Sequence, residues 1–226
     1  MLTLILGGAR SGKSRHAQTL AEASGLAVTV VATARAGDAE MAQRIARHRA
    51  ERPAHWHTVE EPLALADTLA RHAETSRIQV VDCLTLWLLN LLEAGEDVFP
   101  RERAALLAVL PGLAGDVVLV ANEVGLGVVP LGELSRRFVD EAGRLNQALA
   151  GIADEVVLVA AGLPLYLKGR KPSPPGGAPT PKPSIPWPGK PPGPARTGSP
   201  SHRAAWAGWR KWRFFWPPCR VGKSLA

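Results

Sequence analysis

Residues 2–14 read Leu2-Thr-Leu-Ile-Leu-Gly-Gly-Ala-Arg-Ser-Gly-Lys-Ser14, an apolar run followed by the pattern G-x-x-x-x-G-K-S. The run has the length of a short buried strand, and helical spacing begins at Lys13. Between a strand and a helix, this pattern forms a loop whose backbone N–H groups surround a phosphate. Lys13 then reaches the β- and γ-phosphates, and Ser14 offers a hydroxyl to Mg²⁺. The stretch therefore predicts nucleoside triphosphate binding by Gly7, Gly8, Ala9, Arg10, Ser11, Gly12, Lys13 and Ser14.

Strand and helix patterns alternate from this loop to residue 169. Apolar runs predict further strands at 27–32, 78–82, 117–121 and 155–160, and helical spacing predicts helices at 13–23, 39–49, 63–73, 84–92, 101–110 and 131–150. Strands that alternate with helices pair in parallel through right-handed crossovers. We expect an α/β fold of the P-loop NTPase (RecA-like) class, a mostly parallel sheet with helices on both faces. No uninterrupted apolar run approaches the roughly 18 residues of a membrane span, so none is predicted.

Composition changes abruptly after residue 169. Of the 226 residues, 170–226 hold 11 of the 27 Lys and Arg and none of the 20 Asp and Glu, so 1–169 carry 16 cations against 20 acids, a net charge of −4. The last segment also holds 14 of the 20 prolines, and such a composition cannot offset the entropy lost on ordering. We predict a domain at 1–169, with no nucleic-acid partner, and a disordered Pro-rich basic tail at 170–226. The sudden loss of every acid suggests a frame-altered extension.

Asp82 ends the predicted strand at 78–82. P-loop enzymes place an acid there to hold Mg²⁺, which makes Ser14 and Asp82 candidate metal ligands. The alternative is a structural role, because an Asp in this position also caps the helix that follows. The two cysteines, Cys83 and Cys219, cannot form a disulfide framework, which fits a reducing cytoplasm.

One histidine lies on the polar face of the predicted helix at 39–49. Glu40, Arg44 and His48 are four residues apart and share that face. A neutral imidazole is a competent nucleophile, and neighbouring arginines can hold phosphate oxygens in bidentate pairs. A solvated helix face that ends before Pro53 explains the same spacing, so both interpretations stay open on spacing alone.

Four blocks of sequence, in order, resemble the bifunctional adenosylcobinamide kinase/adenosylcobinamide-phosphate guanylyltransferase family of cobalamin synthesis. They are the P-loop continued through Arg15-His-Ala17; Glu40-Met-Ala-Gln-Arg-Ile-Ala-Arg-His-Arg49 with Arg52-Pro-Ala-His-Trp-His-Thr-Val-Glu60; Val81-Asp-Cys-Leu-Thr85; and Asn122-Glu-Val-Gly-Leu-Gly-Val-Val-Pro130 with Gly143-Arg-Leu-Asn-Gln147. The resemblance covers about residues 1–169, and its second and fourth blocks are more diagnostic than the P-loop. Some members carry a second histidine where this chain has Arg47.

The resemblance implies a two-step reaction with Mg²⁺. Such enzymes move the γ-phosphoryl group of ATP or GTP onto the hydroxyl of adenosylcobinamide, then transfer GMP from GTP to that phosphate, giving adenosylcobinamide-GDP and pyrophosphate. His48 matches the histidine that attacks the α-phosphorus and carries GMP. Beyond the P-loop and Asp82, the family's nucleotide contacts match Ala32, Thr33, Ala34, Arg49, Ala50, Glu51, Arg52 and Glu60. The resemblance also implies a cytoplasmic homo-oligomer, a trimer with a cleft between subunits.

Some roles stay open at this stage. Glu60 is placed at the ribose by the resemblance, and its alternative is a solvated loop acid. Asn122 and Glu123 end a strand where open α/β sheets bind ligands, and we expect them to orient substrate or nucleotide. Gly125 and Gly127 favour a tight turn.

Two other functions also stay open. One is a small-molecule kinase with a P-loop and no covalent intermediate. The other is an anionic-surface or nucleic-acid-binding protein, because the tail from Trp206 to Trp216 mixes aromatic and basic residues.

Overall fold

The computed structural model describes residues 1–169, and the predictions made for residues 170–226 lie outside the described residues. The seven strands are β1 (Leu2–Gly7), β2 (Ala27–Ala32), β3 (His57–Glu60), β4 (Arg77–Asp82), β5 (Asp116–Asn122), β6 (Glu155–Ala160) and β7 (Leu163–Lys168). The helices are α1 (Lys13–Ala23), α2 (Ala39–Ala50), α3 (Leu65–Arg71), α4 (Leu84–Ala94), α5 (Val98–Val109) and α6 (Glu133–Ile152), with a short 3₁₀ turn at Leu110–Gly112.

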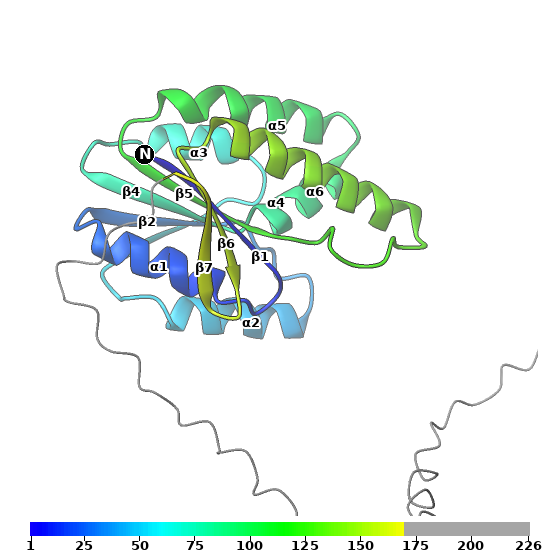
Figure 1. Cartoon of the computed structure of the whole chain (residues 1–226), viewed down its shortest axis with the longest axis horizontal. Coiled ribbons are helices and arrows are strands. Elements are labelled where there is room, and N and C mark those ends of the chain that lie inside the picture. Colours follow the sequence, from blue (N-terminus) through cyan, green and yellow to red (C-terminus); the bar gives the residue numbers. More distant parts are fainter. Residues whose placement is uncertain (170–226) are drawn as a thin grey trace, which may run out of the picture. The chain divides into compact units, whose positions relative to one another are not determined.

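The strands form one sheet in the order β3-β2-β4-β5-β1-β6-β7. Every neighbouring pair is parallel except β6 and β7, which are antiparallel. Helices α3, α4, α5 and α6 cover one face, and α1 and α2 lie on the other (Figure 1). The predicted P-loop α/β class is therefore confirmed. Within residues 1–169, no helix combines the length and the apolar character that crossing a membrane requires.

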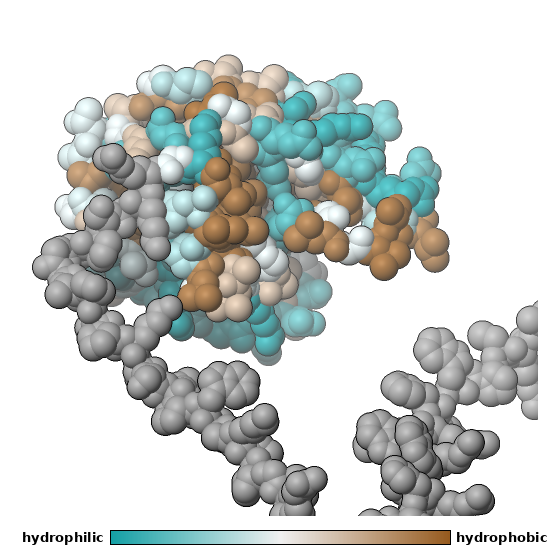
Figure 2. Space-filling model, in the orientation of Figure 1, coloured by the Kyte–Doolittle hydropathy of each residue, from teal (hydrophilic) through white to brown (hydrophobic). Residues whose placement is uncertain are grey.

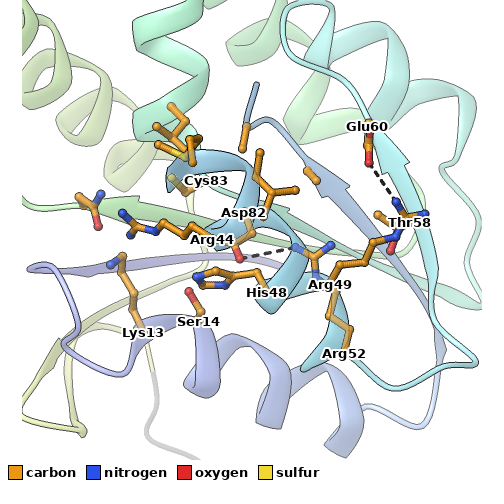
Figure 3. Close-up of a pocket in the computed structure, with 16 residues that line it drawn as sticks. Lys13, Ser14, Arg44, His48, Arg49, Arg52, Thr58, Glu60, Asp82 and Cys83 are labelled. Carbon is orange, nitrogen blue, oxygen red and sulfur yellow. Dashed lines mark hydrogen bonds and ion pairs between the residues drawn. The ribbon is translucent and has the colours of Figure 1, made fainter. Parts of the chain in front are cut away.

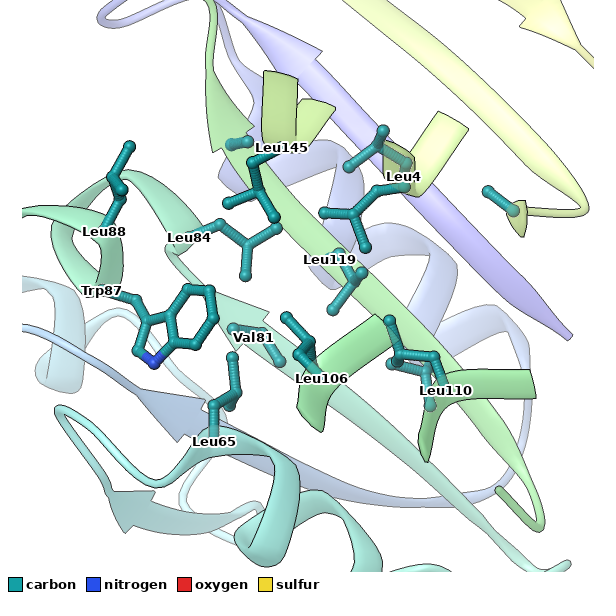
Figure 4. Packing of buried hydrophobic residues seen from close by; sticks show 14 of the residues in the cluster. Leu4, Leu65, Val81, Leu84, Trp87, Leu88, Leu106, Leu110, Leu119 and Leu145 are labelled. Carbon is teal, nitrogen blue, oxygen red and sulfur yellow. The ribbon is translucent and has the colours of Figure 1, made fainter. Parts of the chain in front are cut away.

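Each face of the sheet has its own apolar cluster. Leu4, Val81 and Leu119 point from the strands toward leucines of the covering helices and toward Trp87 of α4 (Figure 4). Trp87 is fully buried, and its indole N–H donates to the carbonyl of Leu63 at 2.8 Å. Trp87 is therefore a packing residue, and its hydrogen bond removes the cost of a buried polar group.

The opposite face is packed by smaller side chains. Ala17 and Ala21 of α1 are buried against Ile5, Val30 and their neighbours on the central strands. Alanines allow the helix to approach the sheet closely, which fixes α1, and with it the P-loop at its start, relative to the strands.

The sequence patterns do not predict two edge strands. β3 is four residues long, pairs only with β2 and buries none of its side chains, so it lacks an apolar run. β7 carries Pro164 and pairs only with β6. Proline is confined to edge strands because it cannot donate to a sheet. The helices expected at 63–73 and 131–150 are α3 and α6, each displaced by about two residues at its ends.

The carboxyl ends of five strands meet at one edge of the sheet. Gly7 lies opposite Asn122, and Ala32 lies between Glu60 and Asp82 in the strand register. Open α/β sheets bind ligands at this edge. The parallel topology thus brings together segments that lie far apart in the sequence.

Candidate active site

The P-loop bends sharply after β1, and its glycines permit the bend. A Cβ on Gly7 would lie 2.5 Å from Oγ of Ser11 and 2.6 Å from the carbonyl oxygen of Val159. Gly12, directly before α1, has a φ of 96°, in the left-handed region that favours glycine. The loop therefore needs glycine at Gly7, where a side chain would not fit, and at Gly12, where the backbone is left-handed.

Lys13 is held inside this loop. Its Nζ donates to the carbonyl of Gly8 at 3.2 Å, while the backbone N–H of Gly162 donates to the carbonyl of Ser11 at 2.8 Å and braces the loop from the β6–β7 turn. Burial lowers the pKa of Lys13, because the charged form loses water. A bound phosphate would offset that loss.

A pocket opens beside the P-loop at the carboxyl edge of the sheet, and it holds about 680 Å³ including its mouth. The P-loop, α2 and the ends of four strands form its walls (Figure 3). Of the residues predicted from sequence, it brings together Ala32 and Ala34 with the polar side chains of Lys13, Ser14, His48, Arg49, Arg52, Glu60 and Asp82.

His48 reaches the pocket from the last turn of α2. Asp38 starts this helix by accepting a hydrogen bond from the backbone N–H of Met41 at 2.7 Å. His48 is partly buried and lines the same pocket as Lys13 and Ser14. In Figure 3 its imidazole points into the pocket. The alternative of a purely solvated helix face does not describe this side chain.

Two arginines near His48 are paired with acids. Arg49 lies 3.4 Å from the carboxylate of Glu60, and both side chains are mostly exposed. Arg52 lies 3.8 Å from Asp82, and its side chain is only 10% exposed. Burial lowers the pKa of Arg52, and the charge of Asp82 opposes that shift. Glu60 therefore ends a strand and has a partner rather than lying in a loop, although its carboxylate is still largely exposed to solvent.

Asp82 does not cap the helix that follows it. Cys83 precedes α4 directly, and no side chain caps that helix. The carboxylate of Asp82 instead lies 3.8 Å from Arg52, and both side chains line the same pocket as Ser14. The structural alternative for Asp82 is therefore wrong.

Other predicted residues do not line the pocket. Thr33 is buried, and its hydroxyl donates to the carbonyl of Cys83 at 2.7 Å and accepts from the N–H of Cys83 at 3.0 Å. This tie holds the end of β2 against the end of β4. Ala50 and Glu51 are exposed where α2 ends. The residues between Gly7 and Gly12 shape the phosphate loop with their backbone, outside the pocket lining.

The pocket also contains residues to which the sequence assigns no role. Met41 and Ile45 supply an apolar strip of α2, and Arg44 lies between them. The spacing of Arg44, four residues before His48, is the signal that could have identified it. Thr58 belongs to β3, which the sequence does not predict. Asn122, expected at this edge, does line the pocket.

Three further residues close to the site have packing roles. Cys83 is buried, and burial raises the pKa of its thiol, which disfavours a nucleophilic thiolate. His16 packs edge-on against Tyr166, with ring centroids 6.5 Å apart, and burial lowers its pKa. Trp56 is 8% exposed and belongs to the core, at a small cavity that Arg52 and Asp82 also line.

The residues after Asn122 form a turn. The Oε1 atom of Glu123 accepts a hydrogen bond from the backbone N–H of Gly125 at 3.0 Å. The carboxylate of Glu123 therefore stabilises the turn to which it belongs. The turn expected at Gly125 is confirmed.

A sequence model of one protein family matches this chain over residues 3–167, and that family is described as cobinamide kinase / cobinamide phosphate guanyltransferase. The chain belongs to this family. The matched region contains the P-loop, His48 and the whole pocket. The description of this family names two phosphorus chemistries, a kinase and a guanyltransferase reaction. A pocket that combines a P-loop with a histidine agrees with both.

Curated relatives support the same membership. The bifunctional adenosylcobalamin biosynthesis protein CobP of Pseudomonas aeruginosa is 62% identical over 170 residues, which are 75% of this chain and 98% of that protein. The CobU protein of Escherichia coli, with the same description, is 40% identical over 182 residues, 74% of this chain and all of that protein. Among solved structures, the RadB recombinase aligns with a TM-score of 0.43 and 18% identity, over 70% of this chain and 73% of that one.

Proposed function

We propose that this chain is a bifunctional enzyme that phosphorylates adenosylcobinamide with ATP or GTP and then transfers GMP from GTP to the new phosphate. The observation that carries the proposal is the joint presence of Lys13 and His48 in one pocket. A P-loop lysine serves phosphoryl transfer, and an imidazole serves covalent nucleotidyl transfer. Family membership supplies the substrate class.

In the kinase step, the P-loop grips the β- and γ-phosphates. Lys13 and the backbone N–H groups after Gly8 neutralise charge that builds up as the γ-phosphoryl group moves to the substrate hydroxyl. No covalent bond to the protein forms in this step, so His48 is not needed.

In the guanylyl step, His48 is the nucleophile. An unprotonated imidazole nitrogen forms a bond to the α-phosphorus while the bond from that phosphorus to the bridging oxygen breaks, and the electron pair leaves with pyrophosphate. The proton on the other ring nitrogen passes to solvent, so the ring of the phosphoramidate is uncharged while its phosphoryl oxygen keeps a negative charge. An oxygen of adenosylcobinamide phosphate then attacks the same phosphorus, the electron pair of the N–P bond returns to the ring, and the ring regains a proton from solvent to restore the neutral imidazole.

Ser14 and Asp82 fit a magnesium ion. Both supply oxygen, both line the pocket, and Mg²⁺ is usually held by one or two protein oxygens together with water and substrate phosphates. Residues 1–169 hold no cluster of three or more acidic, histidine or cysteine ligands, as a dedicated transition-metal site would need. When bound, Mg²⁺ would neutralise the phosphate charge.

The direct test supplies the purified full chain with adenosylcobinamide, ATP, GTP and Mg²⁺. We expect adenosylcobinamide phosphate to appear first and adenosylcobinamide-GDP with pyrophosphate to follow, as separated by liquid chromatography and mass spectrometry. Phosphorylation without any GDP product would favour the small-molecule kinase. A chain ending at residue 170 should give the same products, and their loss on truncation would contradict the boundary that we propose after residue 169.

We also propose that the enzyme is a homo-oligomer, a trimer by family resemblance, in the cytoplasm. Two exposed apolar surfaces support association (Figure 2). One consists of Leu163, Leu165 and Leu167 along β7, and the other of the loop after β5, where Val128 is 96% and Leu131 is 98% exposed. Apolar surfaces of this kind mark interaction sites.

Substitution in the loop after β5 tests the oligomer. Light scattering coupled to size exclusion should give about three times the chain mass of 24.0 kDa for the native protein. Leu131→Asp should shift the mass toward one chain, since a buried charge at an interface is costly. Glu133→Gln, just beyond it, is the control. A native protein that is monomeric at micromolar concentration would contradict the proposal.

A further inference from the structure

The pocket has more positive than negative charge. Its Lys, Arg, Asp and Glu side chains are four cations and two carboxylates: Lys13, Arg44, Arg49, Arg52, Glu60 and Asp82. Arg49 is within 3.4 Å of Glu60, and Arg52 is within 3.8 Å of Asp82. Each carboxylate is thus matched to one arginine. Among residues 1–169, the pocket cations outside any ion pair are Lys13 and Arg44.

Arg44 lies on the same face of α2 as His48, one helical turn earlier. None of the ion pairs formed within residues 1–169 includes Arg44. Figure 3 shows its guanidinium on the side of the pocket where Lys13 lies, away from the pair formed by Arg49 and Glu60. Arg44 therefore reaches the phosphate side of the pocket.

The charges of Arg44 and Lys13 act on each other. Burial is the largest cause of the lowered pKa of Lys13, Cys83 and Asp82 oppose it, and the positive charge of Arg44 adds a smaller contribution that lowers the pKa further. Two cations that face one volume repel each other in the absence of an anion. A polyphosphate between them would turn that repulsion into two attractions.

We propose that Arg44 binds the β- and γ-phosphates of GTP together with Lys13, and so holds the pyrophosphate that leaves when His48 takes GMP. This inference rests on the proposed function of the pocket. As the bond between the α-phosphorus and the bridging oxygen breaks, negative charge builds up on the leaving pyrophosphate. The guanidinium of Arg44 lies on the helix that carries the nucleophile, so one element supplies both the attacking nitrogen and a donor to the leaving group.

An arginine suits this role better than a lysine would. Its planar fork donates two parallel hydrogen bonds to phosphate oxygens, whereas an ammonium is a point charge on a flexible stem. Arg44→Lys should therefore retain only part of the function. Arg47, three residues further along α2, is exposed and lies outside the pocket lining, which makes Arg47→Ala a control with the same change in charge.

The experiment separates the two halves of guanylyl transfer. In the first half, α-labelled GTP is mixed with the full-length enzyme, and the rate of protein labelling is measured. Arg44→Ala should slow labelling about 10- to 100-fold, the range expected for one charge-assisted hydrogen bond to phosphate. Arg44→Lys should lie between, and Arg47→Ala should match the native enzyme.

In the second half, enzyme labelled to completion is freed of GTP and given either adenosylcobinamide phosphate or pyrophosphate. Arg44→Ala should transfer GMP to adenosylcobinamide phosphate at a rate within about twofold of native, because no pyrophosphate takes part. The pyrophosphate concentration that half-maximally removes the label should rise about 10- to 100-fold, since pyrophosphate has lost one donor.

Native labelling kinetics in Arg44→Ala, or a defect confined to transfer onto adenosylcobinamide phosphate, would overturn the assignment of Arg44. Absence of label on the native enzyme would instead overturn the guanylyl-histidine mechanism on which the assignment rests. The two failures are therefore distinguishable.

Discussion

Replacing His48 with alanine should abolish guanylyl transfer and leave the kinase step largely intact. The imidazole supplies the nitrogen that bonds to the α-phosphorus, and loss of a nucleophile costs at least about a thousandfold in rate. The γ-phosphoryl transfer needs no bond to the protein, so it should stay within about threefold of native. Both rates can be measured in one reaction, from adenosylcobinamide phosphate and adenosylcobinamide-GDP formed over time.

A second variant guards against an indirect effect. His48→Asn keeps a polar side chain of moderate size on the partly buried position but removes the nucleophile. It should behave like His48→Ala. Equal collapse of both activities in a folded variant would contradict the division of labour between α2 and the P-loop.

Lys13→Ala should damage both activities by about 100- to 1000-fold, the range found when a single donor to a developing charge is removed. The Nζ atom of Lys13 donates to the loop carbonyl of Gly8, and both steps need charge neutralised on the β- and γ-phosphates. The rates of phosphorylation and of protein labelling by GTP are the measurements.

The matched control for Lys13 lies two residues further along α1. Arg15 is exposed and lies outside the pocket lining, so Arg15→Ala removes a positive charge from the same helix without touching the site. It should retain both activities. A Lys13→Ala enzyme that guanylylates normally would show that pyrophosphate leaves without the P-loop.

The sequence predicts the frame of this site well, because the P-loop and the parallel strands have strong local signals. Gly7 and Gly12 are dictated by space and by φ, and buried apolar runs identify the strands that end at Ala32 and Asp82. The carboxyl edge of a parallel sheet then brings their ends together.

Local sequence patterns do not predict which side chains contact each other. Arg52 approaches Asp82 across 30 positions of sequence, and Thr33 ties to Cys83 across 50. The same limit hides Arg44, whose spacing on α2 fits a solvated face as well as a phosphate site. Edge strand β3 escapes prediction because its side chains are not buried. Tertiary contacts decide all of these features, not periodicity.

The most direct measurement is the site of covalent labelling. The native enzyme is incubated with α-labelled GTP and Mg²⁺, denatured and digested, and the labelled peptide is sequenced by mass spectrometry. GMP should be attached to His48 through a bond that is labile to acid and stable to base, as a phosphoramidate is. Label on another residue, or none while adenosylcobinamide-GDP still forms, would contradict the account.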